Sequence, residues 1–329
     1  MRVATMVYLM FAAFTARTLA ADFDAWTQSA RYELEYAVDL KPLLERDGTG
    51  VRLWLPLPAD HAGQKLVSQD VSSPWTTRST ADALGNRFLY LEPAPGAAGT
   101  TVSVKYTIER RVYRGVPKQE LVDGSPADPH RFLAADKLVP LNGVLRDLAV
   151  QQTGPATTAA EKIRRYYDYV VATMTYKKEG EGWGRGDALW ACDSKYGNCT
   201  DFHAVLIGMA RSQKIPARFM IGFPIPADKT EGEIAGYHCW AELYDDVRGW
   251  VPVDASEAKK SGRADAYFGT LPSDRVEFTL GRDLVLEPRQ AGEPLNFFIY
   301  PYAEVDGKPA GKLPLTVKFR RVTAGEATP

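Results

Sequence analysis

Three separated residues, Cys199, His238 and Asp254, are of the types that acyl transfer through a thiol requires. In that chemistry a thiolate attacks a carbonyl carbon, an imidazole protonates the leaving group, and a carboxylate orients the imidazole. Cys199 precedes a run with apolar residues at helical spacing, so we predict that it lies at the start of a helix. Free backbone N–H groups and the helix dipole favour an anionic sulfur there. We predict Cys199 as the nucleophile, His238 as the base and Asp254 as the partner that orients the base.

Two stretches of alternating apolar residues flank a turn at 245–249, and this pattern predicts a β-hairpin. If Tyr244 pairs with Trp250, His238 and Asp254 become diagonal neighbours on one face of the hairpin. Their side chains are then within reach of each other. The hairpin register therefore predicts that the base and its orienting carboxylate meet.

A zinc site is an alternative use of the same residues. Cys199 and His203 lie four positions apart on the predicted helix, and His238 adjoins Cys239. The sequence lacks the paired Cys-x-x-Cys spacing of a structural zinc site, so we expect no metal and no cofactor. Taken singly, Cys199 and His238 also fit ordinary core residues, and Asp254 fits a turn-capping acid.

The cysteine count leaves a second point open. The sequence has 3 cysteines, so at least one thiol stays unpaired within a single chain. A disulfide between Cys192 and Cys239 is one possibility in an oxidising compartment, and it would leave Cys199 free.

The first 21 residues predict a secretory signal peptide, with Arg2, an uncharged run from Val3 to Phe14 and small residues up to Ala21. The apolar run is too short to span a bilayer, so we expect no transmembrane segment and a periplasmic or secreted protein. Without Arg2 and Arg17, the mature chain has 38 basic and 41 acidic residues. No basic stripe is present, which argues against nucleic acid as a partner.

The remaining chain divides into three predicted parts. Strict apolar alternation from Arg31 to Leu40 recurs further on, which predicts an antiparallel β-sandwich-like domain over residues 22–116. A change to proline and glycine near 117 opens a second domain, residues 117–260, where Thr158-Ala-Ala-Glu161 fits a helix capping box. Strand-like segments return in a C-terminal β-rich extension, residues 261–329.

Four segments resemble, in order and spacing, the catalytic blocks of the bacterial transglutaminase-like superfamily. They are Gly197-Asn-Cys-Thr-Asp-Phe-His203, Ile215-Pro-Ala-Arg-Phe219, Tyr237-His-Cys-Trp-Ala-Glu242 and Trp250-Val-Pro-Val-Asp-Ala-Ser256. The resemblance is concentrated in residues 155–257. It implies an α+β, papain/transglutaminase-like core in which the helix carrying Cys199 packs on an antiparallel sheet. It also implies Cys199, His238 and Asp254 as the catalytic triad.

The resemblance leaves the reaction open, because members of the family transfer acyl groups to amines, hydrolyse amides or have lost activity. We favour hydrolysis of a peptide, protein or cell-envelope amide, as in a protease or amidase. Nothing in the sequence selects an amine acceptor, and no clustered acidic loop would bind calcium. The alternative is a non-catalytic cell-envelope binding or assembly module that retains the fold.

Overall fold

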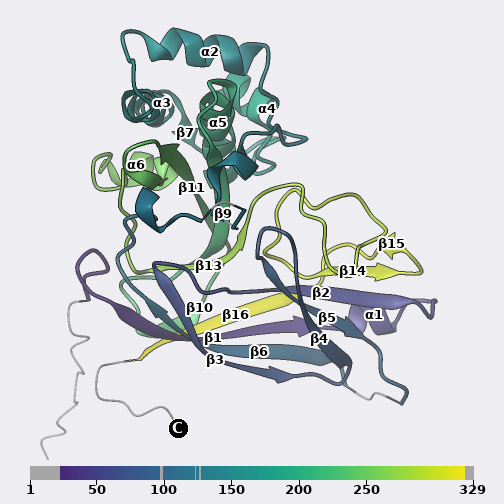
Figure 1. Cartoon of the computed structure of the whole chain (residues 1–329). Helices are drawn as coiled ribbons and strands as arrows, with labels where there is room; N and C mark the ends of the chain where they lie inside the picture. The colour runs from purple at the N-terminus through teal and green to yellow at the C-terminus, as the bar shows by residue number, and fades with distance from the viewer. Residues whose placement is uncertain (1–22, 97–98, 123, 126, 323–329) are drawn as a thin grey trace, which may run out of the picture.

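The computed structural model of the chain describes residues 23–322 except 97–98, 123 and 126 (Figure 1). The predicted signal peptide, residues 1–21, lies outside the described residues. Within the described part, no helix combines the length and the apolar character that crossing a membrane requires. The fold is α+β, with mostly antiparallel sheets, which confirms the predicted class.

Two five-stranded antiparallel sheets form the lower part of the molecule in Figure 1. The first has the order β10-β16-β1-β6-β3, with bounds Glu231–Glu233, Leu315–Val322, Ala30–Asp39, Thr101–Arg110 and Gln64–Ser72. The second has the order β15-β14-β2-β5-β4, with bounds Lys308–Pro309, Tyr302–Val305, Val51–Leu57, Arg87–Glu92 and Thr76–Ala81. Apolar side chains of both sheets belong to one core.

Strand β1 alternates buried and half-exposed side chains along its whole length, as its sequence predicts. It pairs with β6 on one side and with β16 on the other, so a strand from the end of the chain completes the first sheet. Strand β14 likewise pairs with β2 in the second sheet. The chain thus returns to its N-terminal sheets after passing through the helical part. The exact domain boundaries at 116 and 260 stay a prediction.

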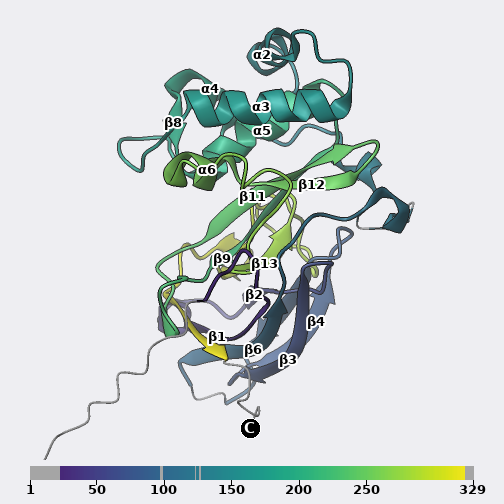
Figure 2. The same ribbon diagram turned by 90° about the vertical axis from the view of Figure 1, so that its left-hand side faces the viewer.

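A four-stranded antiparallel sheet and five helices form the upper part (Figures 1 and 2). The sheet has the order β12-β11-β9-β13, with bounds Gly249–Val253, His238–Asp245, Ala217–Pro224 and Arg275–Leu280. The helices are α2 Val144–Thr153, α3 Ala159–Thr173, α4 Ala188–Ser194, α5 Cys199–Ser212 and α6 Ala255–Ser261. The shorter elements are α1 Lys41–Leu44, the 3₁₀ turns η1 Lys118–Glu120 and η2 Pro129–Phe132, and the parallel pair β7 Thr175–Tyr176 and β8 Tyr196–Gly197.

Helix α5 is the centre of the upper part. It is buried from Cys199 to Arg211 and packs against β11 and β9 as well as against the other four helices. A helix that is buried on all sides is expected to be apolar around its whole circumference, and α5 is uniformly apolar from Ala204 to Ala210, between the buried polar residues His203 and Arg211. The capping box predicted for Thr158 and Glu161 is present at the start of α3.

The two parts are joined by hydrogen bonds that hold β13 against the sandwich. The side chain of Gln64 donates to the carbonyl of Glu277 at 2.9 Å and accepts from its N–H at 2.9 Å. The segment before β14 is also tied to the first sheet, because the hydroxyl of Tyr36, on β1, donates to the carbonyl of Ile299 at 3.0 Å. Strand β13 therefore has a fixed position between the lower sheets and the helical part, and this matters for the site described next.

Candidate active site

Cys199 is the first residue of α5, as predicted, and only 2 % of its surface is exposed. Asn198 caps the helix, because its side-chain oxygen accepts the N–H of Thr200 at 2.9 Å. The carboxylate of Asp201 accepts the N–H of Asn198 at 2.9 Å and completes a capping box. The sulfur thus lies at the positive end of a rigid, well-capped helix, where a thiolate is stabilised.

Asp201 also ties the glycine-rich loop to this helix start. Its buried carboxylate accepts the N–H groups of Gly184 at 2.6 Å and Gly186 at 2.9 Å, in addition to that of Asn198. A Cβ at Gly197, where φ is +154°, would lie 2.3 Å from this carboxylate, so only glycine fits there. The sequence reasoning missed Asp201, although its place three residues after the cap was a signal for it.

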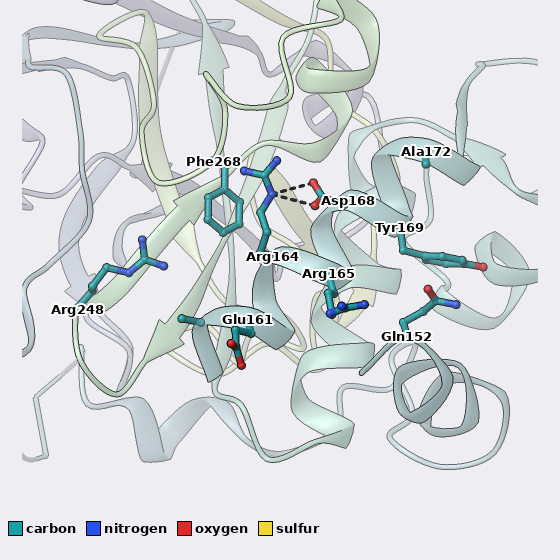
Figure 3. Close-up of a pocket in the computed structure, with 10 residues that line it drawn as sticks. Gln152, Glu161, Arg164, Arg165, Asp168, Tyr169, Ala172, Arg248 and Phe268 are labelled. Carbon is teal, nitrogen blue, oxygen red and sulfur yellow. Dashed lines mark hydrogen bonds and ion pairs between the residues drawn. The ribbon is translucent and has the colours of Figure 1, made fainter. Parts of the chain in front are cut away.

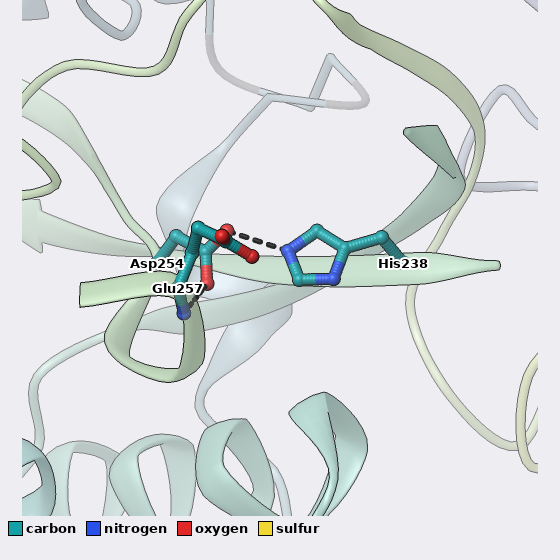
Figure 4. Close-up of side chains that lie close together, drawn as sticks. All are labelled: His238, Asp254 and Glu257. Atoms are coloured by element: carbon teal, nitrogen blue, oxygen red, sulfur yellow. Dashed lines mark hydrogen bonds and ion pairs between the residues drawn. The ribbon is translucent and has the colours of Figure 1, made fainter. Parts of the chain in front are cut away.

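The hairpin forms with the predicted register. Tyr244 of β11 lies opposite Trp250 of β12. His238 is the first residue of β11, and Asp254 directly follows β12 and caps α6. The Nε2 of His238 lies 2.6 Å from Oδ2 of Asp254 (Figure 4). The other oxygen, Oδ1, accepts from the backbone N–H of Glu257 at 2.9 Å, so the helix cap fixes the carboxylate that holds the imidazole.

The electrostatics of these groups favour an ion pair. Burial acts to lower the pKa of His238, but the carboxylate of Asp254 and the Cys199 sulfur outweigh it and raise the pKa to about 9. Burial acts to raise the pKa of Asp254, but His238 and Arg275 hold it well below its usual range. Burial likewise acts to raise the pKa of Cys199, yet hydrogen bonds from Cys239 and His238 bring it well below that of a free thiol. A thiolate beside an imidazolium is the favoured state at neutral pH.

The two nitrogens of His238 therefore have different roles. Because Nε2 donates to the ionised carboxylate of Asp254, Nδ1 is the nitrogen that can exchange a proton with the Cys199 sulfur. The structure brings the three predicted residues together from three elements: the start of α5, the start of β11 and the cap of α6.

His203, considered above as a zinc ligand, has both ring nitrogens occupied by backbone groups. Its Nδ1 donates to the carbonyl of Cys199 at 2.7 Å, and its Nε2 accepts the N–H of Ala255 at 3.1 Å. Burial lowers its pKa, which keeps the ring neutral. His203 is thus a clamp between the first turns of α5 and α6, and it contributes to the site by fixing Cys199 relative to Asp254.

Among the described residues, one group has the spacing of metal ligands. Ligand atoms of His238, Asp254 and Glu257 lie within 4.8 Å of one another. The guanidinium of Arg275 is already against both carboxylates, with Nη2 at 3.8 Å from Asp254 and 3.9 Å from Glu257. An arginine therefore supplies positive charge where a metal ion would.

The candidate disulfide between Cys192 and Cys239 is not formed, because all three cysteines are free and buried. The two sulfurs have different neighbours. The Cys192 sulfur, on α4, lies 3.8 Å from Nζ of Lys195. The Cys239 sulfur, on β11, lies 3.7 Å from Nδ1 of His203. Cys239 acts to lower the pKa of the Cys199 thiol, whereas burial raises its own pKa well above the usual value.

Aromatic residues of the C-terminal region border the site through Tyr237. Asn198 donates through Nδ2 to the hydroxyl of Tyr237 at 3.1 Å. The ring of Tyr237 packs against Phe297 at 5.5 Å and edge-on against Tyr300 at 5.8 Å between centroids. These residues come from a segment that the sequence reasoning treated only as an extension.

A separate hollow of about 970 Å³ lies along α3 (Figure 3). Arg164, Arg165 and Arg248 line it together with Phe268, and Arg164 is paired with Asp168 at 2.9 Å. None of the three candidate catalytic residues lines this hollow, so it is not the place where the thiol would meet a substrate.

Comparison with known proteins agrees with this geometry. Residues 146–255, which contain all three candidate residues, match the model of the transglutaminase-like superfamily. This part of the chain is a transglutaminase-like domain. A cysteine protease-like protein of Cytophaga hutchinsonii has a similar structure, with a TM-score of 0.60 and 15 % identity over 92 % of this chain and 94 % of that one. The shared fold therefore extends beyond the matched domain to the β-rich parts.

Two relatives in sequence are also found for the chain. An uncharacterized protein of Haemophilus influenzae is 25 % identical over 326 residues, covering 86 % of this chain and 88 % of the relative. YebA of Bacillus subtilis is 25 % identical over 127 residues, which are 34 % of this chain and 17 % of YebA. The first relative extends along most of the chain, whereas the second shares only a limited region.

Proposed function

We propose that this protein is an exported cysteine-dependent acyl-transfer enzyme that acts on peptide or amide bonds through Cys199, His238 and Asp254. The observation that carries the proposal is the imidazole of His238, held by Asp254 at 2.6 Å, beside a thiol at the start of a buried helix. The match of residues 146–255, which contain all three residues, to the transglutaminase-like superfamily supports it.

In the first half of the proposed reaction, the Cys199 thiolate attacks the carbonyl carbon of the amide. The backbone N–H of Cys199 itself would be the donor to the oxyanion that forms, because the N–H groups of Thr200 and Asp201 already donate to Asn198. The Nδ1 proton of His238 passes to the leaving amine, the C–N bond breaks and a thioester remains. Neutral His238 then takes a proton from water, the hydroxide attacks the thioester, and Cys199 leaves as a thiolate. Asp254 holds the imidazole through both halves.

We favour water over a second amine as the acceptor, so that the protein acts as a protease or amidase. The sequence contains no clustered acidic loop of the calcium-binding type and no feature that selects an amine. Peptide, protein or cell-envelope amides are the substrate class that we infer.

Incubation with a peptide library and an added primary amine tests the proposal, with products identified by mass spectrometry. We expect cleaved peptides; peptides joined to the amine would indicate transamidation instead. Cys199→Ala should abolish turnover and leave the unfolding transition in place. Cys192→Ala is the matched control, because this thiol contacts Lys195 away from the triad, and it should retain activity.

The opposing outcome is a non-catalytic binding module. In that case Cys199 of the wild-type protein would react with iodoacetamide at pH ~6 no faster than an ordinary thiol, whose pKa is near 8.5. Turnover that persists in Cys199→Ala would exclude the thiol mechanism itself.

A further inference from the structure

Arg275, the first residue of β13, reaches the triad from outside the matched family domain, which ends at residue 255. It is 5 % exposed, and its Nη2 lies 3.8 Å from Oδ2 of Asp254 and 3.9 Å from Oε2 of Glu257. Its Nη1 donates to Asp274 at 2.6 Å, which fixes the guanidinium. The oxygen of Asp254 that faces Arg275 is the same oxygen that holds His238.

Titratable and charged groups from several elements surround Asp254. They are His238 and Cys239 on β11, His203 on α5, Tyr167 on α3, Tyr176 on β7, Glu257 on α6, Tyr267 and Asp274 before β13, and Arg275 on β13. Within this set Arg275 is the cation that never loses its proton, because a guanidinium stays charged in proteins. His203 is neutral, and His238 must release its proton in each cycle of the proposed reaction.

We propose that Arg275 is a positioning residue that keeps Asp254 ionised, and therefore aligned on His238, at the stage when the imidazole has given its proton away. The inference rests on the proposed function. At that stage the buried carboxylate has lost the imidazolium, and Arg275 is its remaining counter-charge. Without it, a buried carboxylate tends to take up a proton. The protonated acid would then no longer accept a bond from Nε2.

The proposal makes the C-terminal segment part of the catalytic machinery. Strand β13 pairs with β9 in the sheet that also carries His238, and it is held to the sandwich through Glu277 and Gln64. The matched domain alone would thus contain all three triad residues and still lack the charge that supports the carboxylate.

The sign of the effect follows from electrostatics. Removing a cation raises the pKa of each acid near it, so Asp254 becomes protonated at a higher pH and the imidazolium loses its partner. The Cys199 thiolate then also forms at a higher pH. An arginine next to an aspartate lowers the pKa of that aspartate by roughly one to three units. Because Asp254 acts on the Cys199 thiolate only through His238, we expect the acid limb of the pH profile to move upward by less than this, up to about one pH unit.

The test uses Arg275→Gln and Arg275→Lys in the full chain. Two quantities are followed against pH: the rate at which iodoacetamide alkylates the peptide containing Cys199, and kcat/KM for a cleaved peptide. We expect Arg275→Gln to move both acid limbs upward and to slow alkylation, at a pH on the acid limb of the wild-type protein, by up to roughly tenfold. Arg275→Lys keeps the positive charge, so its acid limb should lie within about half a pH unit of the wild-type limb.

Arg211→Gln is the matched control. Arg211 is 3 % exposed and is paired with Asp136 at 2.8 Å, at the other end of α5 from Cys199. It should lower stability without moving the acid limb. If both glutamine variants moved the limb equally, Arg275 would have only a structural role, and the proposal would be overturned.

An unchanged limb in folded Arg275→Gln would also overturn it. If this variant does not fold, Arg275→Lys carries the test, and a limb displaced by more than about half a unit would refute the role of the charge. Failure of the proposed function can be distinguished from failure of the role of Arg275. In that case Cys199 of the wild-type protein would react with iodoacetamide like an ordinary thiol.

Discussion

Asp254→Asn separates the orienting role of this residue from its role as a helix cap. An asparagine oxygen can still accept the N–H of Glu257, which Oδ1 of Asp254 accepts at 2.9 Å. The negative charge on the oxygen that holds His238 at 2.6 Å is lost, however. The substitution therefore removes the support of the imidazolium and leaves the start of α6 capped.

The structure sets the size of the effect. Asp254 is the largest of the influences that raise the pKa of His238 to about 9. Measured from the ordinary histidine value, that increase corresponds to at most about 3 kcal/mol of preference for the imidazolium. If most of it is lost, the Cys199 thiolate at pH 6 loses its partner, and its population falls roughly 10²-fold.

The assay is alkylation of Cys199 by iodoacetamide at pH 6, followed by mass spectrometry of the peptide that contains it. This measurement needs no substrate. We expect Asp254→Asn to react roughly 10²-fold more slowly than wild type, and kcat/KM to fall by about 10² to 10⁴. Asp254→Ala should show the same slow alkylation and in addition lose about 1 kcal/mol of stability, because the cap is gone.

Equal alkylation rates in wild type and Asp254→Asn would refute this reasoning, since the carboxylate would then have no influence on the thiolate. An alanine variant as stable as the asparagine variant would show that the hydrogen bond to Glu257 does not stabilise α6.

Three further predictions concern the same region. The rate of turnover should fall above pH ~9, because the raised pKa of His238 means that the imidazolium is lost there; a kcat/KM profile level to pH 11 would contradict this. Native protein should incorporate one alkyl group, at Cys199, and three after unfolding without reductant; fewer than three would reveal a disulfide. Asp201→Ala should cost about 1 to 3 kcal/mol in urea unfolding by leaving two buried N–H groups and one half-buried N–H group unpaired, whereas Asp147→Ala, on an exposed surface, should change little.

Local features of the site could be predicted from the sequence. The start of α5 at Cys199 and the pairing of Tyr244 with Trp250 are both observed. A helix start depends on a cap and on apolar spacing within a few residues, and a hairpin register depends on a short turn. His238 and Asp254 are only 16 residues apart, so the same local rule brings them into contact.

Only the tertiary structure decided which distant residues meet. Strand β16 pairs with β1 and β14 pairs with β2, and no local pattern identifies a strand's partner from the far end of the chain. The same holds for side chains at the site. Arg275 contacts Asp254 because β13 joins the sheet of β9, and Asp201 holds a loop 15 to 17 residues earlier in the chain.

The cysteines show the same limit of sequence-based prediction. The sequence gives their number, whereas only the structure shows which groups surround each thiol. The periodicity of apolar residues indicates which face of a helix or strand is buried, and capping and turn residues indicate where these elements begin and end. The choice of partner is made by packing among elements that are far apart in sequence. For this protein the sequence was sufficient to predict a nucleophile, a base and a carboxylate, whereas the fold supplied the arginine, the clamp at His203 and the second thiol that surround them.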